Sequence, residues 1–175
     1  MIRKATQNDI EGIVKIYDAI IKKEEEHSLC VGWKRGVYPT EDTAEKALNK
    51  NELYVLEDNN HIVAAAIINQ TQVLEYKNCN WTYQVQDDEI MVLHTLVVDP
   101  EKSNKGYGKK FVEFYEEFSA QSGIEYLRMD TNAKNLGARK FYKKIGYQEV
   151  GVVSCEFNGI EGVQLICLEK RLFHK

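Results

Sequence analysis

The sequence of 175 residues has no long hydrophobic run. Its longest uninterrupted apolar stretch, residues 62–68, has the length of a β-strand, whereas a helix that crosses a bilayer needs about 20 apolar residues. The first residues also lack the apolar segment of a signal peptide. We therefore expect a cytoplasmic protein with no membrane partner.

An excess of basic charge is absent as well. The chain carries 23 Lys and Arg against 27 Asp and Glu, which gives a formal net charge of −4 at pH 7. A general nucleic-acid surface needs a basic patch that releases counterions from the phosphates. This composition argues against nucleic acid as a partner and favours a small molecule.

Cysteine and proline are both scarce. The four cysteines, Cys30, Cys79, Cys155 and Cys167, form no Cys-x-x-Cys pair, so the spacing of a metal site is missing and reduced thiols are expected. There are two prolines, and no linker rich in Pro, Gly or Ser interrupts the chain. We expect one domain over residues 1–175 and no bound metal.

The hydrophobic periodicity predicts alternating helices and strands. Two turn signals stand out, since Asn59-Asn60 and Asn158-Gly159 both favour hairpins. The predicted elements in chain order are a strand at 2–5, a helix to about 23, a helix after Thr40, strands at 53–57 and 62–68, a long connection at 69–89 with room for a bent strand, a strand at 90–98, a helix to about 120, a strand at 126–131, a helix at 135–144, and strands at 147–157 and 163–170.

A glycine-rich turn joins the apolar strand at 90–98 to the amphipathic helix that follows. Gly106 and Gly108 lack a Cβ, so backbone amides there can approach a phosphate or pyrophosphate. The first turn of a helix adds free N–H groups and the positive end of the helix dipole. A short Gly-x-Gly also occurs in plain turns, so this motif alone leaves both interpretations open.

Two motifs together resemble those of the GCN5-related N-acetyltransferases (GNAT), which move an acetyl group from acetyl-CoA to an amine. Val98-Asp99-Pro100 with Ser103-Asn104-Lys105-Gly106-Tyr107-Gly108 is similar to the family's pyrophosphate loop, Gln/Arg-x-x-Gly-x-Gly/Ala. The stretch from Asn132 through Asn135, Ala138 and Tyr142 to Gly146-Tyr147 is similar to the signature of its fourth helix. The resemblance covers nearly the whole chain.

The resemblance implies an α/β (α+β) fold: a single GNAT-type domain with a central mixed, mostly antiparallel sheet and helices on both faces. It implies acetyl-CoA as co-substrate, a small-molecule amine or a protein amino group as acceptor, and a monomer or homodimer. The residues implied to bind the cofactor are Leu96, Val97, Val98, Ser103, Asn104, Lys105, Gly106, Tyr107, Gly108, Lys109, Asn135 and Tyr142. The family usually has Gln or Arg in place of Ser103, so weaker or differently balanced CoA binding is expected.

Tyr142 is the implied general acid that protonates the leaving thiolate. Asn135 is implied to hold the pantetheine arm, although it could be only a helix cap, and Tyr142 could be only a core residue. The general base stays open among His94, Glu89 and a relay of water molecules. Strand alternation predicts that His94 lies on the same face as Leu96 and Val98, where a histidine is either a base or a hydrogen-bonded core residue.

Trp33, Arg35 and Tyr38 are candidates for the acceptor site, because the connection between the first two helices usually faces the acceptor in this family. The resemblance implies an N-acetyltransferase that acts by direct attack of a primary amine. The alternative is a catalytically weak or inactive CoA-binding sensor of the same fold. A Walker-type phosphate loop is disfavoured, because Lys110 occupies the position that requires Ser or Thr.

Overall fold

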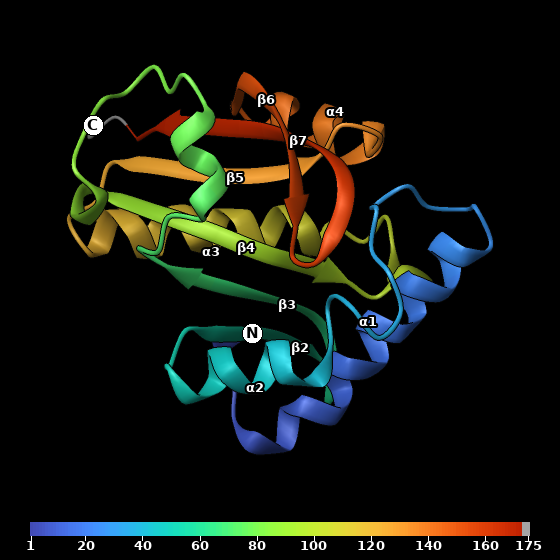
Figure 1. Ribbon diagram of the computed structural model, residues 1–175. Helices are drawn as coiled ribbons and strands as arrows, with labels where there is room; N and C mark the ends of the chain where they lie inside the picture. The colour runs from blue at the N-terminus through green and yellow to red at the C-terminus, as the bar shows by residue number, and fades with distance from the viewer. Residues whose placement is uncertain (173–175) are drawn as a thin grey trace.

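The computed structural model describes residues 1–172 and shows a seven-stranded sheet in the order β1-β2-β3-β4-β5-β7-β6 (Figure 1). All neighbouring strands are antiparallel except β4 and β5, so the predicted mixed, mostly antiparallel sheet is confirmed. The strands are β1 Ile2–Lys4, β2 Leu53–Asp58, β3 His61–Asn69, β4 Ile90–Val98, β5 Tyr126–Asn132, β6 Gln148–Phe157 and β7 Ile160–Arg171. The α-helices are α1 Ile10–Glu25, α2 Glu41–Asn49, α3 Tyr107–Gln121 and α4 Leu136–Lys144.

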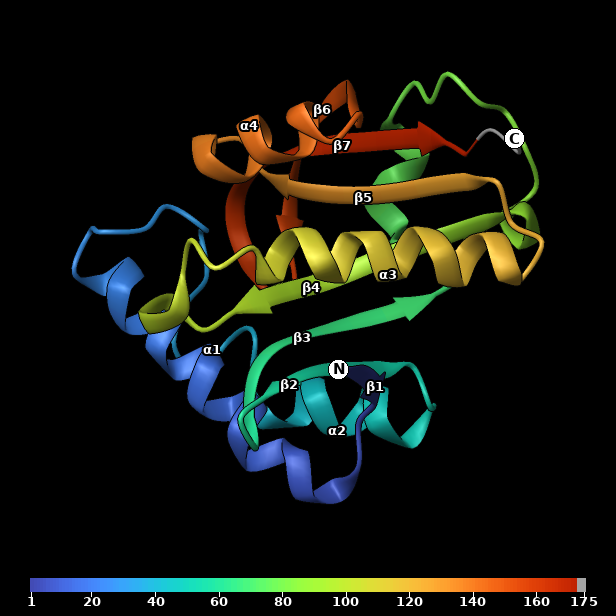
Figure 2. The ribbon, with the colours of Figure 1, turned by 180° about the vertical axis from the view of Figure 1, so that it is seen from behind.

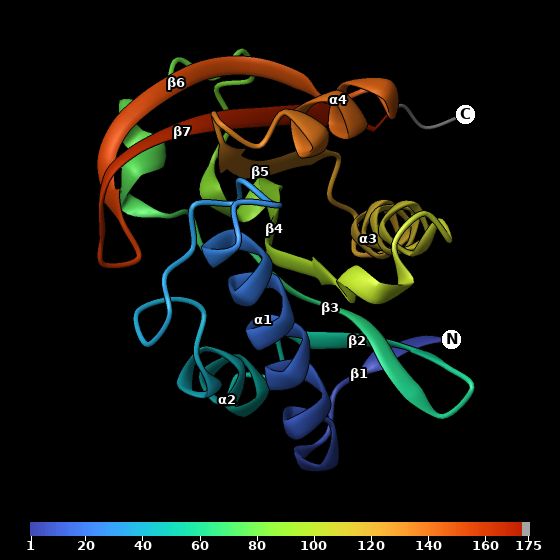
Figure 3. The same ribbon diagram turned by 90° about the vertical axis from the view of Figure 1, so that its right-hand side faces the viewer.

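The helices cover both faces of the sheet, as expected (Figures 2 and 3). On one face, α3 and α4 pack over a single core cluster that includes Phe111, Tyr115 and Leu127. On the opposite face the core is divided. One cluster lies beneath α1 and α2 and includes Ile13 and Val97, while a separate cluster lies beneath the connection between β3 and β4.

That connection contains no strand, which corrects the expectation of a bent strand at residues 69–89. It forms two short 3-10 helices instead, η2 Leu74–Asn78 and η3 Asp87–Glu89. Two buried aromatic side chains hold it on the sheet, with the indole N–H of Trp81 donating to the Tyr76 carbonyl at 2.9 Å. The Arg128 guanidinium lies 4.1 Å from the centre of the Trp81 ring, so β5 also anchors the connection.

A β-bulge interrupts β4 at Thr95. The register with β3 passes from His94 opposite Ile67 to Val97 opposite Ala65, so β4 uses one residue more than its partner. Thr95 has a positive φ of 50°. The bulge reverses the alternation, so Leu96 and Val98 pack with the α3 cluster while His94 faces the α1 side. The prediction that His94 shares a face with Leu96 and Val98 was therefore wrong.

β4 and β5 diverge halfway along their length, as Figure 1 shows. They pair only from Ile90 opposite Tyr126 to Leu93 opposite Met129. β4 then continues to Val98 and β5 to Asn132, and β5 keeps its pairing with β7. The opening between the two strands leaves the second half of β4 with no strand partner on its β5 side within residues 1–172.

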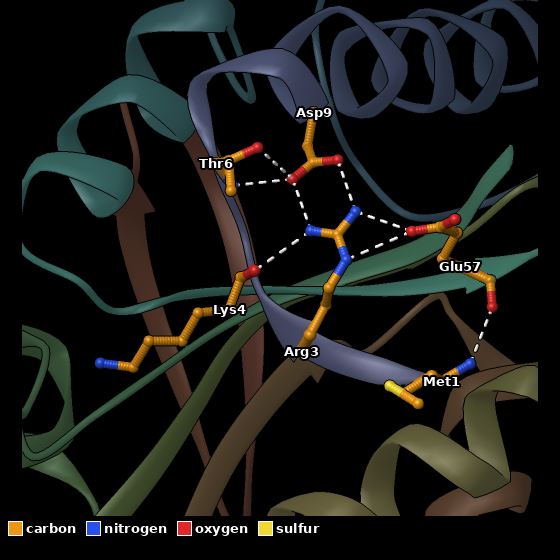
Figure 4. Close-up of polar contacts among 6 residues, drawn as sticks. All are labelled: Met1, Arg3, Lys4, Thr6, Asp9 and Glu57. Atoms are coloured by element: carbon orange, nitrogen blue, oxygen red, sulfur yellow. Dashed lines mark hydrogen bonds and ion pairs between the residues drawn. The ribbon is translucent and has the colours of Figure 1, made fainter. Parts of the chain in front are cut away.

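An ion-pair network fixes the start of the chain to the sheet (Figure 4). The Arg3 guanidinium donates to both carboxylate oxygens of Asp9, at 2.8 and 2.9 Å, and to Glu57 on β2 at 2.8 Å. The hydrogen bonds from Arg3 hold the pKa of the Asp9 carboxyl below its usual range. Asp9 also accepts from the Thr6 backbone N–H at 2.7 Å, so the network sets where α1 begins.

Candidate functional site

A cavity of about 470 Å³ lies where β4 and β5 diverge. It occupies the gap between the two core clusters of the α1 face, and α4 reaches it from the other side of the sheet. Its lining includes the predicted residues Trp33, Tyr38, His94, Leu96, Val97, Val98, Ser103, Asn135 and Tyr142. Segments that are far apart in the sequence therefore meet in one place.

The glycine loop before α3 leaves its amides open. Gly106 is the N-cap residue of α3 with a φ of 77°, and no side chain caps that end of the helix. A Cβ built on Gly106 would meet nothing within 4 Å among the described residues. The first N–H groups of α3 therefore have neither an intrahelical partner nor a capping side chain, which is the arrangement that binds a phosphate.

The side chains of this loop differ in what they can contribute. Tyr107 turns into the core and donates to Asp58 at 2.5 Å, so only its backbone belongs to the loop surface. The Lys109 ammonium lies 3.2 Å from Glu113 on its own helix, and Lys110 lies over the Tyr107 ring at 5.8 Å. Anion binding here therefore depends on the backbone amides first, with the lysines adding positive charge nearby.

Asn135 is the N-cap of α4, since its side-chain oxygen accepts from the Ala138 N–H at 3.1 Å. The same side chain lines the cavity, so its amide group remains available as a donor. The capping role is thus observed, and the cofactor-binding role of Asn135 stays a prediction.

Tyr142 is 8% exposed and lines the cavity from α4. Its ring packs between Phe141 and Tyr147, with ring centres 5.1 and 6.0 Å away. The hydroxyl makes no hydrogen bond to any side chain or backbone group in residues 1–172. Burial, followed by the charge of Asp130, raises the pKa of Tyr142 above its usual value, so the phenol is protonated at neutral pH and free to donate.

His94 has the features of a core histidine. Its Nε2 lies 2.8 Å from the side-chain oxygen of Asn69, and burial lowers its pKa to about 4. The imidazole is therefore neutral at pH 7 and is a weaker base than an ordinary histidine.

This shift predicts a pH dependence of stability. The folded pKa of His94 lies below the usual 6.5, so the unfolded chain binds the proton more readily and stability is lost as pH falls from about 6.5 to 4. We expect His94→Gln to reduce that loss by up to about 3 kcal/mol, when urea unfolding of both proteins is compared between pH 7 and 4. Parallel pH dependences in the two proteins would contradict the buried neutral state of His94.

Several predicted site residues lie outside the cavity lining: Glu89, Arg35 and the loop residues Asn104, Lys105, Gly106, Tyr107, Gly108 and Lys109. Glu89 is exposed at the far end of β4, where its carboxylate accepts from the Gln86 N–H at 2.9 Å. Arg35 is exposed and pairs with Glu25 at 2.9 Å and with Asp18 at 3.2 Å. The structure does not bring either side chain to the predicted catalytic group.

Trp33 and Tyr38 do line the cavity. Their rings meet edge to face, with centres 6.0 Å apart, and the Tyr38 hydroxyl is hydrogen-bonded to the Thr95 hydroxyl at the bulge. The connection between α1 and α2 therefore closes one side of the cavity.

Asp130 was not among the site residues predicted from the sequence. This residue follows Met129 on β5 and lines the cavity, where burial raises the pKa of its carboxyl to about 6. The available signal was an acidic residue inside a predicted strand, directly after Leu127-Arg128-Met129. The Tyr76 hydroxyl, which donates to Asp130 at 2.7 Å, comes from the long connection at residues 69–89, to which the sequence assigned no function.

The fold and these motifs agree with the comparison to known proteins. Residues 17–147 match the acetyltransferase (GNAT) family. This chain belongs to the GNAT acetyltransferase family. It is similar to a protein of Methanocaldococcus jannaschii named an uncharacterised N-acetyltransferase, with 29% identity over 76 residues. That match spans 43% of this chain and only 34% of the relative.

Two further GNAT comparisons extend over most of the chain. The aminoalkylphosphonate N-acetyltransferase of Salmonella typhimurium is 25% identical over 148 residues, which are 85% of this chain and 84% of that protein. The crystal structure of a GNAT acetyltransferase from Streptococcus agalactiae superposes with a TM-score of 0.83, at 19% identity, and covers 99% of this chain and 96% of the other. The shared fold extends over the strands and helices described above.

As a GNAT member the chain is an acyltransferase whose acetyl donor is acetyl-CoA. The residues present fit this co-substrate, because Ser103 and the unpaired edge of β4 line the same cavity, and the open amides at the start of α3 follow Ser103 on the same loop. Within residues 1–172, no helix is both long and apolar enough to cross a bilayer. The same residues contain no group of three or more His, Cys, Asp or Glu that could hold a metal ion.

Proposed function

We propose that this protein transfers the acetyl group of acetyl-CoA to a primary amine by direct attack of the amine. The observation that carries the proposal is the divergence of β4 and β5, which opens a cavity lined by the free edge of β4, by Ser103 of the loop before α3 and by Tyr142. Cofactor anchoring and proton donation are thereby supported at a single site.

The proposed roles follow from the hydrogen-bonding groups of the site that are available to a ligand. The amides of the loop from Ser103 to Lys109 bind the pyrophosphate, and the exposed edge of Leu96, Val97 and Val98 holds the pantetheine arm as a neighbouring strand would. A backbone N–H of that edge stabilises the negative charge on the thioester oxygen. Tyr142 gives its proton to the departing sulfur.

The alternative is a CoA-binding sensor without turnover. Ser103 is the feature that favours it, because the side chain usual at this position would add a contact to the phosphates or the loop. The unbonded, protonated hydroxyl of Tyr142 favours the enzyme, since a purely structural tyrosine gains nothing from a hydroxyl that has no partner inside the cavity.

A thiol-release screen tests this proposal. The protein is incubated with acetyl-CoA and a panel of small amines and of peptides with free amino groups, and free CoA is measured with a thiol reagent. We expect release above the hydrolysis rate with at least one amine, together with the acetylated amine in the mass spectrum. Binding of acetyl-CoA in calorimetry without thiol release for any amine would instead support the sensor.

A further inference from the structure

Asp130 lies at the point where the two central strands part. The last paired positions are Leu93 on β4 and Met129 on β5, so His94 and Asp130 are the first residues beyond the pairing. Leu127 and Met129 pack in the α3 cluster, so alternation turns Asp130 to the opposite face of the sheet. That is the face covered by the connection between α1 and α2.

One carboxylate oxygen of Asp130 is fixed and the other is available. Oδ2 accepts the Tyr76 hydroxyl at 2.7 Å, and Tyr76 is only 2% exposed. Oδ1 makes no hydrogen bond to another residue in the described part of the chain, although Asp130 lines the cavity. A half-buried carboxylate that lines a cavity and has an unpaired oxygen can accept a hydrogen bond from a ligand.

No basic side chain within residues 1–172 forms an ion pair with Asp130. The guanidinium of Arg128, on the same face of β5, is bound by Gln72, Tyr83 and the Trp81 ring. The other titratable groups around Asp130 are neutral or acidic: His94 on β4, Tyr38, Tyr142 on α4, Tyr76 and Glu75 on η2, Cys167 on β7 and Cys155 on β6. Lys23 is the sole Lys or Arg among the described residues of the lining. A half-buried carboxylate without a counter-ion costs stability, which fits a group kept for a ligand.

We propose that Asp130 binds the ammonium group of the acceptor and takes one of its protons, which frees the lone pair of the nitrogen for attack. This inference rests on the acetyltransferase activity proposed above. The neutral amine then forms a C–N bond to the acetyl carbon as the C–S bond breaks, and the departing sulfur takes the Tyr142 proton. The nitrogen's second proton returns through solvent to the Tyr142 phenolate, and Asp130 releases its proton to solvent, so both residues are restored.

The same geometry restricts the acceptor to amines without an acidic group next to the nitrogen. An α-amino acid or an α-aminophosphonate would bring its own anion within a few ångströms of Asp130, where like charges repel. The cavity lining also includes Trp33, Tyr38 and Phe157, which favour an apolar or aromatic body. We therefore assign apolar primary amines, rather than amino acids or aminophosphonates, as the acceptor class.

Asp130→Asn tests the role directly. Losing a charged hydrogen-bond acceptor should lower kcat/KM for a reactive amine by about tenfold or more, with acetyl-CoA affinity unchanged. The melting temperature at pH 8 should not fall. The raised folded pKa means that this carboxyl contributes stability below its usual pKa of 3.8 and loses it as pH rises through about 6, so the amide removes a cost at pH 8.

Substitutions of two neighbours, Tyr76 and Glu75, should shift the pH profile of kcat/KM, which they would not do if Asp130 were only structural. The Tyr76 hydrogen bond lowers the pKa of Asp130 and the charge of Glu75 raises it. Tyr76→Phe should therefore move the acidic limb of the kcat/KM profile to higher pH, and Glu75→Gln should move it to lower pH.

The outcomes separate the two proposals. A wild-type protein that acetylates no amine overturns the proposed function and this inference with it. A wild-type protein that is active, beside an Asp130→Asn variant with the same kcat/KM and pH profile, overturns the role of Asp130 alone. Equal or higher kcat/KM for α-amino acids than for the matching amines without the carboxylate overturns the acceptor class.

Discussion

Tyr142→Phe is expected to lower kcat by about 10² to 10⁴-fold, the usual contribution of a positioned general acid. A free thiol has a pKa near 8.5, so a thiolate can leave unaided, but a proton donor beside the sulfur assists it. The substitution keeps the ring between Phe141 and Tyr147 and removes only the hydroxyl. Because that hydroxyl has no partner among residues 1–172, its loss leaves no buried group unpaired.

The melting temperature and the acetyl-CoA affinity of this variant should therefore match those of the wild type. Tyr147→Phe is the matched control, since Tyr147 contacts Tyr142 but lies outside the cavity lining. We expect it to keep kcat. Steady-state kinetics with calorimetry and thermal melts on both variants check the assignment, and intact turnover in Tyr142→Phe would show that Tyr142 only packs.

Replacing Gly106 and Gly108 together with valine should weaken acetyl-CoA binding by about a hundredfold or more. Side chains at these positions would cover the amides, and each hydrogen bond to a charged phosphate is worth about 1.5–3 kcal/mol. A Cβ on Gly108 would already lie 3.8 Å from Val98 and 3.9 Å from Phe141, so a larger side chain has to extend over the loop or disturb these contacts.

A control is needed because Gly106 has a φ of 77°, where valine is strained whatever the ligand. Gly123, at the other end of α3, has a φ of 75° and open space around a built Cβ. Gly123→Val should therefore lose comparable stability and keep its affinity in calorimetry. If the double variant binds acetyl-CoA as the wild type does, the phosphates lie elsewhere.

The order of the elements could be predicted because each carries a local signal. The hydrophobic periodicity predicts β4 and α3, and the Asn and Gly residues predict the hairpins. The glycine loop lies between a predicted strand and a predicted helix. Tyr142 could be placed in the site because its motif fixes its position on α4. The assignment of each residue to its chemical role depends on the resemblance to the family.

The features that depend on distant contacts were missed. The bulge in β4 has a threonine at its positive φ, where the usual signal would be glycine, so strand alternation misplaced His94. Asp130 gains its burial and its hydrogen bond from Tyr76, which is 54 positions away in the sequence. Glu89 directly precedes β4 in the sequence, but this end of the strand lies away from the cavity.

The hydrophobic core differs between the two faces of the sheet, and this difference affects how the domain resists mechanical force. The cluster beneath α3 and α4 is continuous across the sheet, whereas on the α1 face it is split at the cavity. The continuous core beneath α3 and α4 therefore connects the two halves of the sheet, β1 to β4 and β5 to β7, which the sheet itself joins only through the short pairing of β4 with β5. A ligand in the opening contacts both halves. Its binding energy therefore also resists their separation when the domain is pulled or heated.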